Sequence, residues 1–330
     1  MTTVRHLLAS AFCTLAIVTT YAQQWPKPLP EAKAGTRWWW MGSAVDRQGL
    51  EWNLGAYARA GIGAVEITPL YGVKGNEKNE LSFLSPAWMR ALKDVQDIAR
   101  PLGIEVDMNC GTGWPFGGPQ VSLEQAACRA IFKESVIDGK KVYNVEIGRT
   151  KQAVKRAAPG GEGWVVDHFD RQAVKHYLER FDKAFAESGV AWPHTFFNDS
   201  YEVYGANWTP TLFDEFQKRR GYDLRQHLPE LLGKTVDGGL PTDKVLADYR
   251  ETLSDLLYEN FTLQWVEWAH SHGVLVRNQA HGSPANLLDL YAAVDIPEIE
   301  GFGLSEFGIK GLRTDPGMTR KNFSDVSMLK

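Results

Sequence analysis

Two acidic residues near the middle of the chain have the setting that acid–base chemistry requires. Asp199 and Glu202 follow the short apolar run at 195–198. In parallel α/β folds, acids at the carboxyl end of a buried strand commonly form the active site. The alternative is that Asp199 caps a turn and that Glu202 is a solvated loop acid. The pair therefore marks a candidate site whose chemistry depends on the residues around it.

Polar and aromatic residues also follow the other predicted strands, and they suit a neutral sugar. Carboxylates and amides pair with hydroxyl groups, while indole rings stack on the C–H faces of sugar rings. Trp114 lies in a Gly-rich loop, 111–118, that matches neither the dinucleotide-binding nor the P-loop spacing. The residues that we expect to bind substrate are Trp40, Glu66, Asn109, Trp114, Asn198, Asn278 and His281.

Hydrolysis of a glycoside needs one carboxylic acid and one carboxylate, and Glu202 is our choice for the ionised partner. Hard oxygen ligands such as Asp199, Glu298 and Glu300 would suit Ca²⁺ better than Zn²⁺. His281 is expected to hydrogen-bond rather than to bind a metal.

Strand-like and helix-like segments alternate along the chain, which predicts parallel β/α units. Strands are expected at 36–40, 64–68, 104–109, 195–198, 274–279 and 294–298, and helices at 46–60, 85–100, 169–187, from about 210, and at 242–272. Period-two alternation around Asp138 and Gly139 predicts a small β-hairpin inserted at about 130–161. We therefore predict an α/β fold, a (β/α)8 TIM-like barrel that is incomplete, with about six β/α units present.

Composition limits the function classes. The chain has 330 residues, 44% of them hydrophobic and 23% charged, which is typical of a globular protein. A formal net charge of −4, with scattered Lys and Arg, disfavours nucleic acid as a partner.

The first 22 residues have the pattern of a signal peptide: Arg5 and His6, an apolar run, and small residues before a cleavage site near Ala22. We expect a periplasmic or secreted protein with no membrane contact after cleavage, and a partial catalytic barrel over 23–330. Cys110 and Cys128 would remain, and the sequence leaves open whether they form a disulfide.

Five blocks of sequence, in this order, resemble glycoside hydrolase family 106, the inverting α-L-rhamnosidases. The blocks are TRWWWMG (36–42), GAVEITPLY (63–71), MNCGTGWPFGG (108–118), NDSYE (198–202) and RNQAHG (277–282). The resemblance implies a (β/α)8 catalytic barrel, a calcium ion that helps to bind rhamnose, and two glutamates as general base and general acid.

By motif position, the resemblance implies that Glu202 is the general base and that Asp199 lies near the sugar or the calcium ion. The general acid is expected beyond Lys330, and the alternatives within the chain are Glu298, Glu300 and Glu306. The implied function is hydrolysis of terminal α-L-rhamnosides in plant oligo- or polysaccharides with inversion of configuration. A non-catalytic carbohydrate-binding protein, an inactive fragment and a metal-dependent sugar isomerase are the alternatives, and the oligomeric state stays open.

Overall fold

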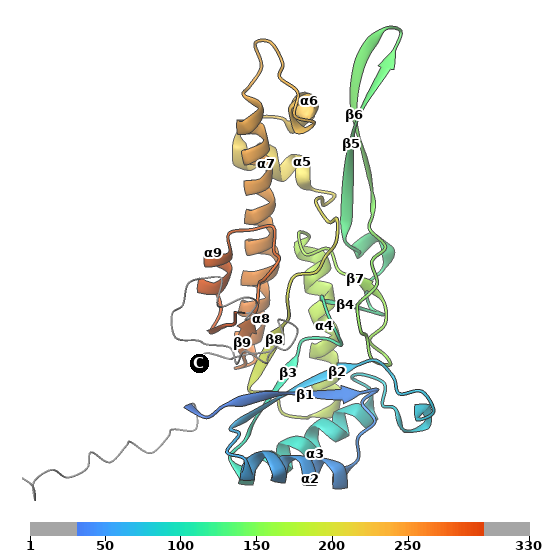
Figure 1. Cartoon of the computed structure of the whole chain (residues 1–330), viewed down its shortest axis with the longest axis vertical. Helices are drawn as coiled ribbons and strands as arrows, with labels where there is room; N and C mark the ends of the chain where they lie inside the picture. Colours follow the sequence, from blue (N-terminus) through green and yellow to red (C-terminus); the bar gives the residue numbers. More distant parts are fainter. Residues whose placement is uncertain (1–31, 300–330) are drawn as a thin grey trace, which may run out of the picture.

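The computed structural model describes residues 32–299, and its centre is one sheet of six parallel strands. The strands lie in the order β1-β2-β3-β8-β9-β10, which is also their order along the chain (Figure 1). Their bounds are β1 Gly35–Met41, β2 Ala64–Leu70, β3 Glu105–Asn109, β8 Thr195–Asn198, β9 Leu275–Asn278 and β10 Ile296–Pro297. Because all six strands run in the same direction, their carboxyl ends lie at the same edge of the sheet.

The sheet is open among the described residues, with β1 and β10 as its outer strands. The expected six parallel strands are therefore present, but a closed barrel is not, and the sixth strand is only two residues long. A barrel requires hydrogen bonds between the first and last strands, which β1 and β10 do not form within 32–299.

Helices cover one face of the sheet. They are α2 Arg47–Arg59, α3 Pro86–Leu102, α4 Arg171–Ser188 and α8 Gln264–Ser271. Side-chain caps fix the starts of three of them, since Asp46, Ser85 and Asp170 each accept a hydrogen bond from a backbone N–H of the first turn. Apolar residues alternate along the strands toward these helices, as the T-shaped contact of Trp38 with Trp40 illustrates.

The helix expected at 242–272 is one helical segment with a change of winding. It comprises α7 Thr242–Leu256, a π-helical stretch, η5 Leu257–Leu263, and α8. Within the π-helical stretch, Asn260 donates to the carbonyl of Phe169 (2.8 Å) and Glu259 pairs with Arg219 (2.6 Å). Such wide turns are rare inside helices and frequently occur near functional sites.

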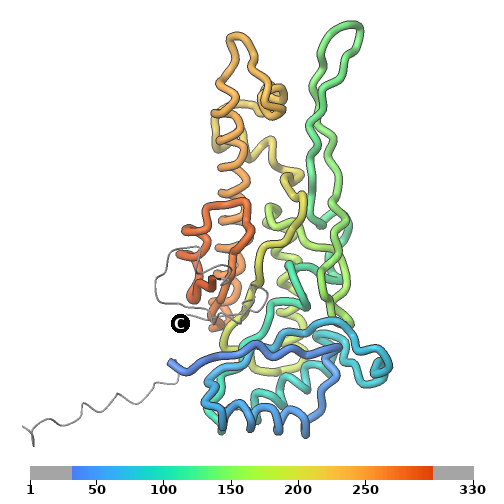
Figure 2. The backbone as a smooth tube through the Cα atoms, viewed as in Figure 1, coloured from blue at the N-terminus to red at the C-terminus, as the bar shows by residue number. Residues whose placement is uncertain are grey.

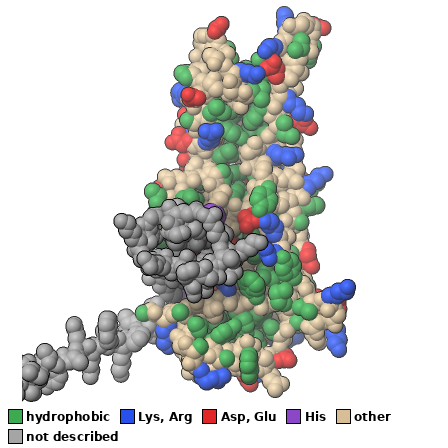
Figure 3. Space-filling view, in the orientation of Figure 1, with side chains coloured by type: hydrophobic (Ala, Val, Ile, Leu, Met, Phe, Trp, Pro, Cys, Tyr) green, Lys and Arg blue, Asp and Glu red, His purple; other side chains and the backbone are tan. Residues whose placement is uncertain are grey.

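Two arms extend from the sheet and lie side by side (Figures 1 and 2). One arm is the hairpin β5 Cys128–Ile137 and β6 Lys140–Arg149, which ends before the expected limit of 161. The other consists of α5 Leu212–Arg220, α6 Leu228–Leu231 and the start of α7. Lys234 and Glu134 form an ion pair across the arms (3.7 Å), and hydrophobic side chains gather between them (Figure 3).

The remaining elements are short. They are β4 Gly117–Gly118, β7 Trp164–Val165, α9 Leu287–Ala292 and the 3-10 turns η2 Glu77–Asn79, η3 Leu123–Gln125 and η4 Leu224–His227. Cys110 and Cys128 are both buried free thiols. In the part of the chain that is described, no helix is both long enough and apolar enough to cross a bilayer.

Candidate active site

Glu202 lies just after β8 and is surrounded by hydrogen-bond donors. Its Oε1 accepts from the indole N–H of Trp114 (3.0 Å) and from the hydroxyl of Ser200 (3.2 Å). Its Oε2 accepts from the hydroxyl of Tyr204 (2.6 Å) and from the ammonium of Lys155. Both carboxylate oxygens therefore already have two donors each.

These donors decide the protonation state of Glu202. Partial burial acts to raise the pKa of the carboxyl group, but the hydrogen bonds from Lys155, Tyr204 and Trp114 outweigh it and lower the pKa to about 2. The side chain keeps 27% of its surface exposed. Glu202 is thus ionised at neutral pH and accessible from solvent.

Two loops far apart in the sequence bring Trp114 and Lys155 together. Each donates its backbone N–H to the carbonyl of the other, at 3.1 and 2.9 Å. Gly113 permits this approach, because a Cβ atom there would lie 1.9 Å from the carbonyl oxygen of Lys155. Gln152, in the same loop as Lys155, donates to the backbone carbonyl of Glu202 (2.7 Å).

Asp199 belongs to a different group of charged side chains, which come from the strands of the sheet and the residues next to them. It accepts from Arg37 (3.0 Å), whose guanidinium is also 3.7 Å from Glu66 and 3.7 Å from Glu298. The register of the sheet explains this, since Arg37 of β1 pairs with Glu66 of β2, which pairs with Asp107 of β3.

Arg277 completes this group from β9. It pairs with Glu66, with Asp107 (3.3 Å) and with Glu298 (3.0 Å) and is 1% exposed. Both guanidinium groups lie over the ring of Phe197, at 4.5 and 4.7 Å. Two cations and four acids thus form one compact ion-pair network, whose acids are Glu66, Asp107, Asp199 and Glu298.

Within this network, the carboxylate of Glu66 is held by side chains of the protein itself. Burial raises its pKa, while Arg277, Arg37 and the hydroxyl of Thr68 oppose that shift. Its side chain is 1% exposed, so it does not present an open surface to a substrate.

The carboxylates expected to bind calcium are occupied by protein donors. Asp199 accepts from Arg37 and from the N–H of Ser200 (2.7 Å), and Glu298 contacts Gln279 (2.9 Å) and Arg277. No group of three or more His, Cys, Asp or Glu within 32–299 could hold a metal ion. These residues therefore do not fit a calcium ion by themselves, and the third expected ligand, Glu300, lies outside the described residues.

The amides expected to bind sugar lie at the carboxyl ends of their strands but are buried. Asn198 donates to Asn278 (2.9 Å) across neighbouring strands, and Asn109 donates to the carbonyl of Gly113 (2.6 Å). All three are 5% exposed or less. They hold the strand-exit loops in place, whereas His281 is exposed and its carbonyl accepts from Tyr201 (2.6 Å).

The prediction that Trp40 binds substrate is wrong. Its side chain is 1% exposed and packs at 5.8 Å from Trp88 of α3, on the helix-covered face. Successive strand residues point to opposite faces, and its neighbour Trp39 is 51% exposed. Trp39 is therefore the indole of this strand that is open to solvent.

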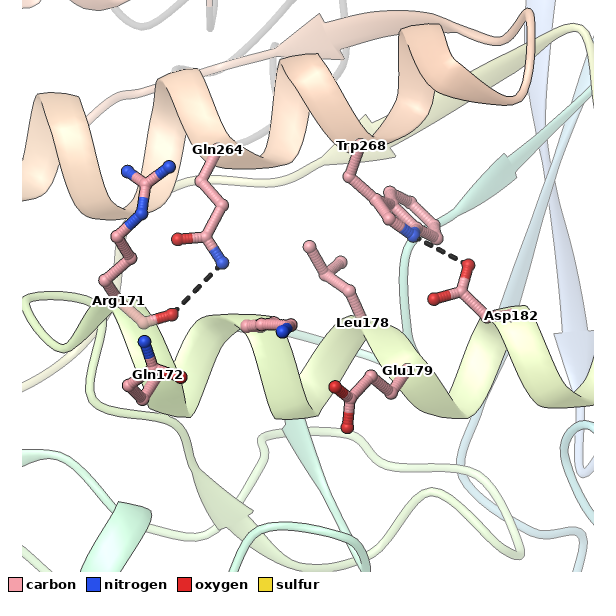
Figure 4. Close-up of a pocket in the computed structure, with 8 residues that line it drawn as sticks. Arg171, Gln172, Leu178, Glu179, Asp182, Gln264 and Trp268 are labelled. Carbon is pink, nitrogen blue, oxygen red and sulfur yellow. Dashed lines mark hydrogen bonds between the residues drawn. The ribbon is translucent and has the colours of Figure 1, made fainter.

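A hollow of about 300 Å³ between α4 and α8 lies away from these residues (Figure 4). Two hydrogen bonds join its lining residues, since Trp268 donates to Asp182 (2.8 Å) and Gln264 donates to the carbonyl of Arg171 (3.1 Å). It is a groove between two helices and contains none of the strand-end residues.

The sequence matches the family described as alpha-L-rhamnosidase, glycoside hydrolase family 106, over residues 26–157 and 147–300. The chain belongs to this family.

Two relatives place this family 106 chain among longer proteins. A Formosa agariphila protein, provisionally named a beta-glucuronidase, is 23% identical over 84% of the chain, which covers 32% of that protein. The structure of a rhamnosidase from Novosphingobium sp. PP1Y superposes with a TM-score of 0.66 at 17% identity, over 82% of this chain and 48% of the other. The family 106 chain thus spans about a third to a half of these relatives, and the second likeness shows a shared fold.

Sequence reasoning missed most of the partners of Glu202 and Asp199. Lys155 lies in an irregular loop, 47 residues before Glu202, and Arg37 lies 162 residues before Asp199. Ser200 and Tyr204, each two residues from Glu202, could have been found from their proximity in sequence. The expected acids Glu300 and Glu306 and the signal peptide lie outside the described residues and stay predictions.

Proposed function

We propose that this chain carries the general base of a site that hydrolyses α-L-rhamnosides with inversion of configuration. The observation that carries the proposal is the ionised, solvent-accessible Glu202 at the carboxyl end of β8, in a chain of the α-L-rhamnosidase family. In the proposed reaction, Glu202 removes a proton from a water molecule that attacks the anomeric carbon.

A general base needs a free lone pair, so one donor must leave Glu202 first. Lys155 and Tyr204 are the candidates, because both bind Oε2 and Tyr204 is 59% exposed. Loss of their hydrogen bonds would raise the pKa of Glu202 and make it a stronger base. We propose that sugar hydroxyls draw these two groups away when the substrate binds.

The general acid is proposed to lie outside residues 32–299. A general acid presents an O–H to the leaving oxygen, whereas both oxygens of Glu298 contact donors, Gln279 and Arg277. Glu300, Glu306 and residues beyond Lys330 stay candidates. A calcium ion also stays a proposal, for a site that such residues would complete.

The proposed substrates are terminal α-L-rhamnosides of plant oligo- or polysaccharides, and the proposed location is periplasmic or secreted. Trp39 and Trp114 offer indole surfaces to sugar rings near the strand ends.

Substitution of Glu202 tests the proposal in the full-length protein. Glu202→Gln should lower kcat on an aryl α-L-rhamnoside by at least about 1,000-fold with an unchanged melting temperature. Glu187→Gln, on the exposed end of α4, is the matched control. Unchanged turnover by Glu202→Gln, or an NMR time course that shows retained anomeric configuration, would overturn it. Binding of rhamnose oligomers without hydrolysis by the unmodified protein would favour a carbohydrate-binding protein.

A second candidate is hydrolysis of glucuronides, which the name of the Formosa agariphila relative favours. An aryl β-glucuronide and an aryl α-L-rhamnoside assayed side by side separate the two. Turnover of the glucuronide alone would select this second function.

A further inference from the structure

Arg156 places a second positive charge next to the candidate base. Its guanidinium lies over the ring of Trp114 (4.9 Å) and over that of Tyr71 (5.7 Å). The same indole of Trp114 donates to Glu202 (3.0 Å), so Arg156 and Glu202 contact one side chain from different directions. The side chain of Arg156 is exposed.

No carboxylate of residues 32–299 forms an ion pair with Arg156. Its neighbour Lys155 is paired with Glu202, but none of the ion pairs formed by the described residues, within 4.0 Å, involves Arg156. An arginine stacked on aromatic rings keeps the N–H groups at its edge free, and these groups match a carboxylate or a sulfate in two-point geometry.

The backbone holds Arg156 in place at a cost in strain. Its φ is 57°, and that of Tyr71 is 44°, both in the left-handed region that non-glycine residues rarely adopt. The carbonyl of Arg156 accepts from the N–H of Tyr71 (3.0 Å), and a Cβ atom on Gly113 would lie 2.9 Å from the carbonyl carbon of Arg156. Strain of this kind persists only where surrounding contacts fix the position, and it concentrates at ligand-binding sites.

We propose that Arg156, stacked on Trp114 and Tyr71, binds an anionic group of the substrate. The substrate class is then an acidic oligosaccharide that carries a carboxylate or a sulfate ester near the rhamnose. This inference rests on the proposed function of Glu202 and adds a specificity determinant to that site. Before substrate binds, Lys155 is paired with Glu202, whereas Arg156 has no ion pair with a described residue.

The test compares matched substrates on the full-length protein. The first pair is a rhamnosyl uronate oligosaccharide and the same oligosaccharide with its carboxyl group reduced to an alcohol. The second pair is an O-sulfated rhamnoside and its unsulfated form. The ratio of KM values, reduced over uronate or unsulfated over sulfated, is expected to be about 10 in the unmodified protein. Arg156→Gln should bring that ratio close to 1, and Arg156→Lys should restore part of it.

Arg90→Gln, an exposed arginine of α3, is the matched control and should keep the ratio. The anion, carboxylate or sulfate, whose KM ratio falls in Arg156→Gln is assigned as the group that Arg156 binds in the natural substrate. Equal loss on charged and neutral substrates in Arg156→Gln, or a ratio of 1 in the unmodified protein, would overturn the proposal. If no rhamnoside is hydrolysed, the function proposed for Glu202 fails. Calorimetric titration of the same oligosaccharides then still decides on Arg156.

Discussion

Four donors around Glu202 stabilise its negative charge before any substrate binds. Trp114 and Ser200 hold Oε1, while Lys155 and Tyr204 hold Oε2. A carboxylate with so many donors is ionised but a weak base, because each hydrogen bond favours the charged form. The reactivity of this residue is therefore set by the groups that can leave it.

Removal of the ammonium of Lys155 should raise the pKa of Glu202. In Lys155→Met, we expect the acid limb of the kcat/KM profile to move up by roughly 1 to 2 pH units from about 2, toward the ordinary value of 4.5. Activity at pH 4 should then fall relative to activity at pH 7, since less of Glu202 is ionised. The measurement is kcat/KM on an aryl α-L-rhamnoside between pH 3 and pH 8.

Lys175→Met removes an exposed lysine of α4 that has no contact with Glu202 and should leave the profile in place. An acid limb that does not move in Lys155→Met would show that Glu202 does not set it.

At the scale of elements, loops rather than strands complete the site. The loop after β3, which carries Trp114, and the loop after the hairpin, which carries Lys155, meet through two backbone hydrogen bonds between these two residues, beside Gly113. The strands fix where β8 ends, and the two loops determine what surrounds Glu202 there.

Gly113→Ala should separate these loops. Gly113 has a φ of 53° and no room for a Cβ atom, so the variant should lose stability and at least about 10-fold in kcat/KM. Gly139→Ala is the matched control, since Gly139 has a φ of 74° but nothing within 4 Å of the added carbon. It should cost about 1 kcal/mol of stability and leave kcat/KM unchanged. Equal kcat/KM in both variants would contradict a role for the close approach.

The segment that leads into α4 contains a buried acid that makes the stability of the protein depend on pH. Burial raises the pKa of Asp167 to about 7 from 3.8, although the N–H of Phe169 donates to it. The folded protein therefore holds a proton that the unfolded chain releases, and stability falls as the pH rises through this window. Burial lowers the pKa of the adjacent His168 to about 4 from 6.5, which acts in the opposite direction between those values.

Asp167→Asn should remove the loss of stability that Asp167 causes as the pH rises, and it should keep the contribution of His168. The free energy of unfolding of the variant minus that of the unmodified protein should increase by roughly 1 to 3 kcal/mol from pH 5 to pH 8. Urea unfolding at both pH values measures this difference. A difference that is the same at pH 5 and pH 8 would contradict a raised pKa for Asp167.

On the scale of the whole molecule, the sheet and the two arms differ in how they are stabilised. The sheet has helices on one face and the Arg37–Arg277 network within it, whereas the hairpin is buried only at its root. Near the tip, Val136 and Ile137 are 66% and 57% exposed. The outer part of the hairpin should therefore contribute little to global stability.

A shortened hairpin tests this. Replacing residues 135–142 with Asp-Gly removes three register pairs, from Ser135 with Val142 to Ile137 with Lys140, and keeps the root. We expect the melting temperature to stay within about 2 °C. Ala130→Asp, at the buried root, is the comparison and should destabilise by about 2 to 4 kcal/mol. A fall of more than about 5 °C in the shortened protein would contradict the expectation.

The sequence by itself determined the local elements and their order. The six strands, the long helical segment before β9 and the hairpin around Asp138 and Gly139 all follow from periodicity and turn residues, which are properties of neighbouring residues. The strand-exit position of Glu202 followed in the same way, because it depends only on where an apolar run ends.

Only the tertiary structure decided which side chains meet. Trp40 faces the helices and Trp39 faces solvent, a choice that alternation alone cannot make when both faces of a parallel strand are apolar. Arg37 reaches Asp199 across 162 residues, and Lys155 reaches Glu202 across 47, through strand register and loop contacts. Such contacts depend on how distant segments pack together, and for that reason they leave no periodic signal in the sequence.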